Sequence, residues 1–456
     1  MKKFSRGIIV PVMCTAVVPA AIASNPPKAK PNIIFILTDD MGYGDVGCYG
    51  GKFVPTPNID RMAAEGLMFT QYYSASPISS PSRAGLLTGI HPAQWNITSY
   101  LQTREGNRNA DMADYLNPAA PTLPHALQNA GYKTGHFGKW HLGGGRDVID
   151  APHITNYGYD EYVSTYESPD PEPLITSTNW IWSDKDSIKR WDRTAYFVDK
   201  TLDFLRRNSD KPCFINLWPD DMHTPWVGNI EEQKVFPEGE SSEHNFRTVL
   251  IEYDRQIGRL LDGLKALGID KNTIVIFTSD NGPAPSFRGS RAGNYRGCKA
   301  SLYEGGMRMP FIVWGLNGRV PKGKIDNSTV ISALDMYTSL CGIADVKVQT
   351  GYKSDGEDLS GALLGKPALR SKPIFFEYRR NDSKAFPKPA DKDESPNLAI
   401  RNGVWKLLIN ADETAPALYN LYDDPRETTN LIEQFPDKAS ELKDKVLKWR
   451  AGFPKL

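Results

Sequence analysis

The run Asn32-Ile33-Ile34-Phe35-Ile36-Leu37 is continuously apolar and ends abruptly in Thr38-Asp39-Asp40. A short run rich in β-branched residues is typical of a strand that is buried on both faces of a parallel sheet. Two further runs of this kind, Cys213–Trp218 and Thr273–Thr278, alternate with helical patterns at 193–207 and 246–264. This alternation predicts an α/β fold, in which helices flank a large, mostly parallel central sheet.

A polar cluster follows each of these three strands. The clusters are Asp39-Asp40, then Asp220-Asp221 with His223, and finally Asp280-Asn281. Ligands of open parallel sheets bind beyond the carboxyl ends of the strands, so we expect the clusters to meet at one edge if the strands are parallel neighbours. Hard oxygen donors suit Ca²⁺ or Mg²⁺. Either acidic pair alone could be a helix cap or a turn, but both pairs follow buried strands, which favours a metal site.

A second signal is Ser79-Ser80-Pro81-Ser82-Arg83, which leads into the apolar Leu86-Leu87 and then Thr88-Gly89. Serines and a proline at this junction are typical of a helix start. We therefore expect Ser79 to lie at the mouth of a helix. Backbone amides and the positive end of the helix dipole gather there and favour an anion.

Basic side chains with no obvious structural purpose complete the pattern. Lys139 and His141 lie between glycines in a predicted loop over 134–145, His223 lies between prolines, and Lys299 precedes another glycine-rich stretch. Taken singly, each is more often an ordinary surface group. Together with Arg83 they predict a cationic pocket around a metal, which suits a phosphate or sulfate ester. The chain has no P-loop, no HExxH and no GxSxG.

Composition and the N-terminus limit the class of protein. Lys+Arg and Asp+Glu both number 54, and this balance gives no support for a nucleic-acid binder. Lys2, Lys3 and Arg6 precede an apolar stretch over 7–22, and Ala21-Ile22-Ala23 is a small-x-small cleavage site. We expect residues 1–23 to be a signal peptide recognised by the secretion machinery, since the stretch is short for a membrane span. A lipoprotein anchored at Cys14 is the alternative.

The pattern of predicted strands and helices changes near residue 365, and we therefore expect two domains. Residues 24–365 carry the buried strands and the polar clusters, and they form the expected catalytic domain. Residues 366–456 contain short strands and a closing helix over Ala439–Trp449, which predict a small α+β subdomain with an antiparallel sheet. Within the first domain, residues 151–192 form a long irregular segment with Trp180, Trp182 and Trp191. So long a segment without periodicity is typically functional.

These motifs together resemble one family. Ser79-Ser80-Pro81-Ser82-Arg83 followed by Leu87-Thr88-Gly89 fits the signature of the formylglycine-dependent sulfatases, in the alkaline-phosphatase-like superfamily. That signature is Cys or Ser, any residue, Pro, Ser, Arg, three residues and Leu-Thr-Gly. Further matches cover nearly the whole mature chain: Pro31–Asp45, Thr134–Gly143, Ser279–Gly282, Arg296–Pro310 and Leu418–Glu427.

The resemblance implies a role for each matching residue. Ser79 would be converted to formylglycine, whose hydrated form supplies a hydroxyl that attacks sulfur. The metal, Ca²⁺ with Mg²⁺ as the alternative, would be held by Asp39, Asp40, Asp280, Asn281 and residue 79. Arg83 and Lys139 would steady the formylglycine, and His141 would bond to it and act as a base. Lys139, His223 and Lys299 would bind the sulfate, with His223 or Lys299 protonating the leaving oxygen.

Serine instead of cysteine at position 79 implies a particular maturation. In the family, a serine is converted by radical-type anaerobic maturases of bacteria. The resemblance therefore implies an anaerobic Gram-negative bacterium and export to the periplasm, the cell surface or the medium. The expected substrate is a sulfated carbohydrate of mucin, glycosaminoglycan or algal origin, attacked from a chain end. Residues near the motifs are candidates for a sugar subsite: His91, Trp95, Arg104, Arg288 and Arg291.

Two other readings stay open at this stage. One is a phosphodiesterase or phosphonate monoester hydrolase of the same superfamily. The other is a non-catalytic binder of sulfated glycans in which Ser79 is never oxidised. The complete set of predicted metal and sulfate residues favours the sulfatase over both.

Overall fold

The computed structural model describes Met1 and residues 30–178, 180–229, 242–348, 350–379 and 389–453. The predicted signal peptide and the alternative lipid site at Cys14 lie outside the described residues. Among the helices that are described, none is both long enough and apolar enough to cross a membrane.

The larger sheet contains nine strands within the described residues, in the order β4-β3-β5-β1-β6-β7-β2-β8 with β9 beside β2. The strand β7 is antiparallel to both of its neighbours, and the other pairings are parallel. The strands are β1 Asn32–Thr38, β2 Leu67–Tyr73, β3 Lys133–Gly138, β4 Glu161–Ser164, β5 Cys213–Trp218, β6 Thr273–Ser279, β7 Arg308–Gly315, β8 Lys324–Asp326 and β9 Ile331–Ser332. The predicted mostly parallel α/β sheet is thereby confirmed.

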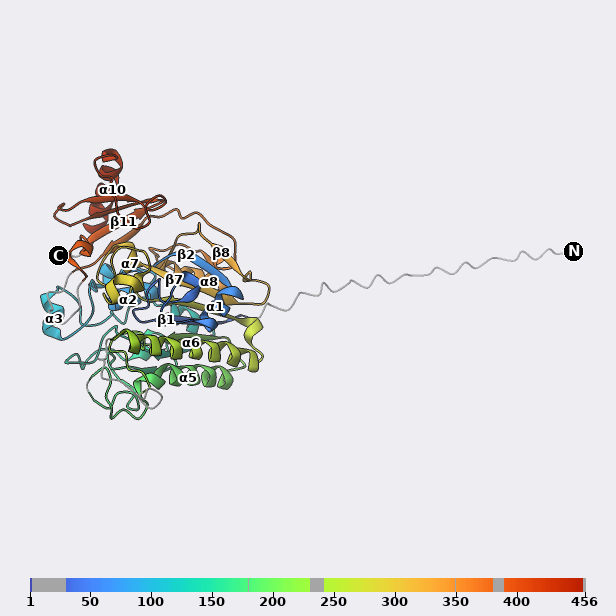
Figure 1. Cartoon of the computed structure of the whole chain (residues 1–456). Helices are drawn as coiled ribbons and strands as arrows, with labels where there is room; N and C mark the ends of the chain where they lie inside the picture. Colours follow the sequence, from blue (N-terminus) through green and yellow to red (C-terminus); the bar gives the residue numbers. More distant parts are fainter. Residues whose placement is uncertain (2–29, 179, 230–241, 349, 380–388, 454–456) are drawn as a thin grey trace.

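Helices cover both faces of this sheet, and β1 shows why. Its side chains alternate between the faces, so Ile34 and Ile36 pack against one layer of helices while Ile33 and Phe35 pack against the other. In Figure 1, α5 and α6 lie side by side along the first of these faces. The helices are α1 Pro57–Ala64, α2 Ser79–Thr88, α3 Arg104–Asn109, α4 Leu123–Asn129, α5 Arg193–Arg207, α6 Glu243–Ala266, α7 Glu304–Met307, α8 Met336–Ile343, α9 Ser360–Leu363 and α10 Pro436–Arg450.

The register of the central strands brings their carboxyl ends together. Strand β1 lies between β5 and β6 and is parallel to both. Thr38 pairs with Ser279, so Asp39 and Asp280 are the next residues of two adjacent strands. Ile36 pairs with Leu217, which sets the loop after β5 at the same edge. The expected meeting of three strand ends is confirmed.

A second, antiparallel sheet lies at the end of the chain, with α10 packed on it (Figure 1). Its strands are β10 Ile374–Glu377, β11 Leu398–Asn402, β12 Trp405–Ile409 and β13 Ala417–Asn420. The buried Lys406 fastens this sheet to the first domain, since its Nζ lies 3.0 Å from Glu304 and 2.9 Å from Glu427. The domain boundary at residue 365 stays a prediction.

Two predicted elements were wrong. Residues 134–138, the first part of the predicted loop over 134–145, belong to the parallel strand β3. Its glycines allow close pairing, because a Cβ at Gly138 would lie 2.0 Å from the carbonyl oxygen of Trp218. The apolar pattern over Thr329–Gly342 also predicts a helix, but the helix starts later, because Ile331–Ser332 pairs with β2 and Ser332 then caps the following turn. Helix α5 and strand β5 have the predicted bounds.

Candidate active site

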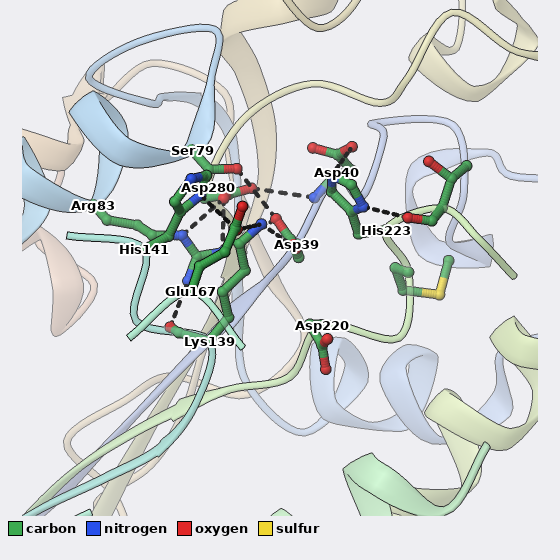
Figure 2. Close-up of polar contacts among 12 residues, drawn as sticks. Asp39, Asp40, Ser79, Arg83, Lys139, His141, Glu167, Asp220, His223 and Asp280 are labelled. Atoms are coloured by element: carbon green, nitrogen blue, oxygen red, sulfur yellow. Dashed lines mark hydrogen bonds and ion pairs between the residues drawn. The ribbon is translucent and has the colours of Figure 1, made fainter. Parts of the chain in front are cut away.

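Ser79 is the first residue of α2 and lies beneath the ends of β1 and β6. Its Oγ is 3.2 Å from Asp39 Oδ1 (Figure 2). It also lies 3.3 Å from Asn281 Oδ1. The N-cap position is Ile78, which offers no side-chain cap. The helix ends at Gly89, whose positive φ of 63° suits glycine. Ser79 is therefore not a capping serine, and its buried hydroxyl points at acceptor oxygens.

Three carboxylates form a cluster next to Ser79, and one of them, Asp39, contacts its hydroxyl. Asp39, Asp40 and Asp280 are buried, and one oxygen from each lies within 4.8 Å of the others. The backbone N–H of Asp40 donates to Asp280 Oδ1 at 3.1 Å, and Asn281 Nδ2 donates to Asp40 Oδ1 at 2.7 Å. Asp40 takes a positive φ of 59° at this turn. The register of β1 and β6 thus places all four predicted ligand side chains beside Ser79.

The electrostatics of the cluster fit a divalent cation. Burial and the nearby carboxylates raise the pKa of Asp280 to about 6, against the opposing effect of Arg83. Burial also disfavours the charged form of Asp39, but Lys139, His223 and Arg83 hold its pKa well below the usual value. Carboxylate and amide oxygens are the donors that Ca²⁺ and Mg²⁺ prefer. These residues therefore fit the predicted metal.

Arg83 fixes the carboxylates from behind. Its Nη2 lies 2.7 Å from Asp280 Oδ2 and 3.2 Å from Asp39 Oδ1, while Nη1 donates to the carbonyl oxygen of Lys139 at 2.9 Å. The guanidinium stacks 5.2 Å from the ring centroid of Trp218 and is fully buried. Because it lies beneath the ligands, we infer that Arg83 positions Asp39 and Asp280.

Lys139 and His141 follow β3 on one side of Ser79. Lys139 Nζ lies 2.9 Å from Asp39 Oδ2. His141 Nε2 lies 3.1 Å from the carbonyl oxygen of Leu101, so this nitrogen carries a proton. Burial lowers the pKa of His141 to about 3, which keeps the ring neutral. Its Nδ1 then has a lone pair and lies 3.3 Å from Glu167 Oε2, a carboxylate that would stabilise a proton accepted at this nitrogen.

Lys299 and His223 lie on the other side, around Asp40. Lys299 Nζ is 2.7 Å from Asp40 Oδ2 and 3.1 Å from His223 Nε2. His223 Nδ1 is 2.6 Å from the carbonyl oxygen of Thr224, so Nδ1 carries the proton and Nε2 accepts from Lys299. Burial and Lys299 lower the pKa of His223. The pair offers an ammonium and an imidazole to one ligand.

Most of the predicted catalytic and metal-binding residues line one cavity of about 510 Å³; Arg83, Asp280 and Asn281 do not. The predicted residues in its wall are Asp39, Asp40, Ser79, Lys139, His141, His223 and Lys299. Asp220 also lines it but lies apart from the carboxylate cluster (Figure 2), because it binds Arg190 at 2.9 Å and Arg193 at 3.0 Å. Of the three tryptophans of the long segment, Trp180 lines the cavity and Trp182 and Trp191 do not.

None of the five residues predicted for the sugar subsite lines this cavity. The His91 ring packs against Trp449, with centroids 4.5 Å apart, and Trp95 donates to Thr88. Arg104 pairs with Asp114 at 2.9 Å and with Asp150, and Arg288 lies in a separate surface groove. Arg291 is buried and binds Asp45 at 2.8 Å. These five residues lie near the motifs in the sequence, but this proximity did not predict the direction in which their side chains point.

Three charged residues of the cavity wall were missed: Arg146, Glu167 and Arg190. Glu167 lies three residues after β4, whose carboxyl end shares the edge of the sheet with β3, and Arg146 lies in the loop after β3. Burial raises the pKa of Glu167, but its contacts with His141, Lys139 and Arg146 outweigh this and hold the pKa at about 2. Recognising Glu161–Ser164 as a strand would have located Glu167.

A buried serine among oxygen donors and lysines, at the edge of a mostly parallel sheet, defines a hydrolase of oxyanion esters. The family model described as Sulfatase matches residues 31–346. The chain therefore belongs to the sulfatase family, with its alkaline-phosphatase-like fold, and it is a sulfuric ester hydrolase.

Individual relatives agree with this assignment. The chain is 29% identical to N-acetylgalactosamine-6-O-sulfatase of Bacteroides thetaiotaomicron, over 91% of this chain and 92% of the relative. It is 34% identical to human N-acetylgalactosamine-6-sulfatase, over 78% of this chain and 70% of the relative. The crystal structure of Ps i-CgsB in complex with k-i-k-neocarrahexaose is 26% identical, covers 92% of both chains and has a TM-score of 0.75.

Proposed function

We propose that this protein removes O-sulfate groups from a carbohydrate, using residue 79 in the form of formylglycine and a divalent cation, Ca²⁺ in the first place. One observation carries the proposal. The Ser79 hydroxyl lies against Asp39 and Asn281 at the wall of a cavity where Lys139, His223 and Lys299 converge. That is the arrangement that a tetrahedral, anionic ester needs.

Each side chain of the site has a distinct role in the proposed reaction. Asp39, Asp40, Asp280 and Asn281 would hold the cation, which would neutralise sulfate charge and polarise sulfur. As formylglycine, residue 79 would supply the attacking hydroxyl. Lys139 and Lys299 bind sulfate oxygens from opposite sides. His141 accepts a proton at Nδ1, and the Lys299–His223 pair gives one to the leaving oxygen.

The carbohydrate part of the proposal is supported by the relatives and by the cavity. Two relatives are named for N-acetylgalactosamine 6-sulfate, and a related structure holds a neocarrahexaose. Exposed Trp180 lines the cavity and offers an aromatic face of the kind on which sugars stack. A sugar at the end of a glycan chain is the proposed substrate, with N-acetylgalactosamine 6-sulfate as the first candidate.

Maturation and export are part of the same proposal. Position 79 is a serine, so conversion requires a maturase of the anaerobic type. The N-terminal pattern Lys2-Lys3 with the apolar 7–22 supports export by the secretion machinery to the periplasm of a Gram-negative anaerobic bacterium.

A substrate panel tests the function. The protein, co-expressed with an anaerobic-type maturase, is given defined sulfated sugars, an aryl sulfate and an aryl phosphodiester. Ion chromatography of released sulfate should show turnover of at least one sugar, with 6-O-sulfated N-acetylgalactosamine the first candidate. The aryl sulfate should be cleaved faster than the phosphodiester. Faster phosphodiester cleavage would favour the phosphodiesterase reading, and sugar binding without any sulfate release would favour the non-catalytic binder.

A further inference from the structure

Arg146 lies in the wall of the catalytic cavity, and the proposed sulfatase mechanism assigns no role to its positive charge. Its Nη2 lies 3.0 Å from Glu167 Oε1. The other oxygen of Glu167 lies 3.7 Å from Lys139 Nζ and 3.3 Å from His141 Nδ1. Glu167 therefore stands directly between the ammonium of Lys139 and the guanidinium of Arg146. If the sulfate of a ligand contacts Lys139, another part of the same ligand can reach Arg146, which lies on the other side of Glu167 in the cavity wall.

The backbone around Arg146 is built for this placement. Gly143, Gly144 and Gly145 all have positive φ, and Arg146 itself has a φ of 55°. A Cβ at Gly144 would lie 2.2 Å from the backbone nitrogen of Pro169, and one at Gly145 would lie 2.9 Å from the carbonyl oxygen of Tyr166. Glycines thus let the loop after β3 press against the segment that carries Glu167. Larger residues there would push Arg146 and Glu167 apart.

The Arg146 guanidinium has N–H donors beyond the one that binds Glu167. Among the described residues, Glu167 is the only hydrogen-bond partner of the Arg146 side chain, which is 27% exposed at the cavity. Arginine presents its donors as a planar fork that matches the two oxygens of a carboxylate or sulfate. Glu167 is shared with Lys139 and His141, so it does not cancel the charge of Arg146 alone.

Building on the proposed function, we infer that Arg146 binds a second oxyanion of the substrate, a carboxylate or another sulfate, within one sugar of the ester that is cleaved. Glu167 is the positioning residue, since it orients the fork of Arg146 toward the cavity. The protein then prefers sugars that carry two anionic groups over sugars that carry only the scissile sulfate.

The test compares substrates that differ in the second anion. Matured wild-type and Arg146→Ala proteins are given a singly sulfated sugar, the same sugar linked to a uronic acid, and a doubly sulfated sugar. The ratio of kcat/KM for a two-anion sugar over the one-anion sugar should fall roughly 10- to 100-fold in the variant, as expected for losing a charge-assisted bidentate contact. Arg146→Lys keeps the charge without the fork and should give an intermediate ratio. Comparing the kcat/KM ratio for the uronic acid substrate with the ratio for the doubly sulfated substrate shows whether Arg146 recognises a carboxylate or a sulfate.

Arg206→Ala is the matched control, because Arg206 lies exposed on α5 and should leave the ratio unchanged. An equal loss of Arg146→Ala activity on all sugars would show a merely structural role and overturn the inference, as would an unchanged ratio. Titration calorimetry with the same sugars on Ser79→Ala protein, with and without Arg146→Ala, gives a readout independent of turnover. Failure of sulfate release would count against the proposed function, whereas equal affinities would count against the role of Arg146.

Discussion

Replacing Ser79 by alanine should lower sulfate release by on the order of 10⁴-fold or more, since the reaction then lacks the precursor of its nucleophile. Within the part of the chain that the structure describes, the Ser79 hydroxyl makes only two weak contacts, at 3.2 and 3.3 Å, with Asp39 and Asn281. Its removal should therefore leave the fold intact. Initial rates measured by ion chromatography, together with thermal unfolding of the same preparation, check both expectations.

Ser76→Ala is the matched control for this prediction. Ser76 is also buried near the start of α2, and its Oγ has no hydrogen-bond partner among the described residues. The control should retain wild-type turnover. Substantial sulfate release by Ser79→Ala protein would contradict the proposed chemistry, because no other residue has been assigned as nucleophile.

Replacing Asp280 by asparagine should produce the second large effect. The change keeps the shape of the side chain but removes one of the three clustered carboxylates and the charge that faces Arg83. We expect metal affinity to fall by more than the roughly 10- to 100-fold typical of losing an outer-shell partner, with activity falling alongside it. Elemental analysis of the dialysed protein, and activity titrated with Ca²⁺ and Mg²⁺, measure the two losses.

Chelation of the wild-type protein provides the control for Asp280→Asn. Activity should disappear with the metal and return when Ca²⁺ or Mg²⁺ is added back. Asp210→Asn, an exposed carboxylate far along the chain from the cluster, should behave as wild type. Full activity of chelated protein, or of Asp280→Asn without added metal, would refute a role for the cation.

The centre of the fold and of the site could be predicted because its signals are local. Strands β1, β5 and β6 are buried on both faces and therefore read as continuous apolar runs. Their polar ends could be placed together by the geometry of parallel sheets alone. The residues proposed to bind metal and sulfate, from Asp39 to Lys299, followed from those ends and from the resemblance to sulfatases.

The periphery could not be predicted in the same way. Strand β3 contains Gly135, His136 and Gly138 and has no apolar run, because its close pairing with β5 needs small residues. Arg291 and His91 lie near motifs in the sequence, but one is buried against Asp45 and the other against Trp449. Side-chain direction in loops depends on tertiary packing, so Arg146 and Glu167 became visible only in the structure.

The most direct test of the proposed chemistry relates sulfate release to the chemical state of residue 79. Preparations with different degrees of maturation are digested, and mass spectrometry of the peptide that contains residue 79 gives the fraction in which serine has become an aldehyde. Sulfate release from the best sugar of the panel is measured on the same samples. The account predicts a rate proportional to that fraction and zero without conversion. Undiminished sulfate release from protein that still carries only serine at position 79 would contradict it.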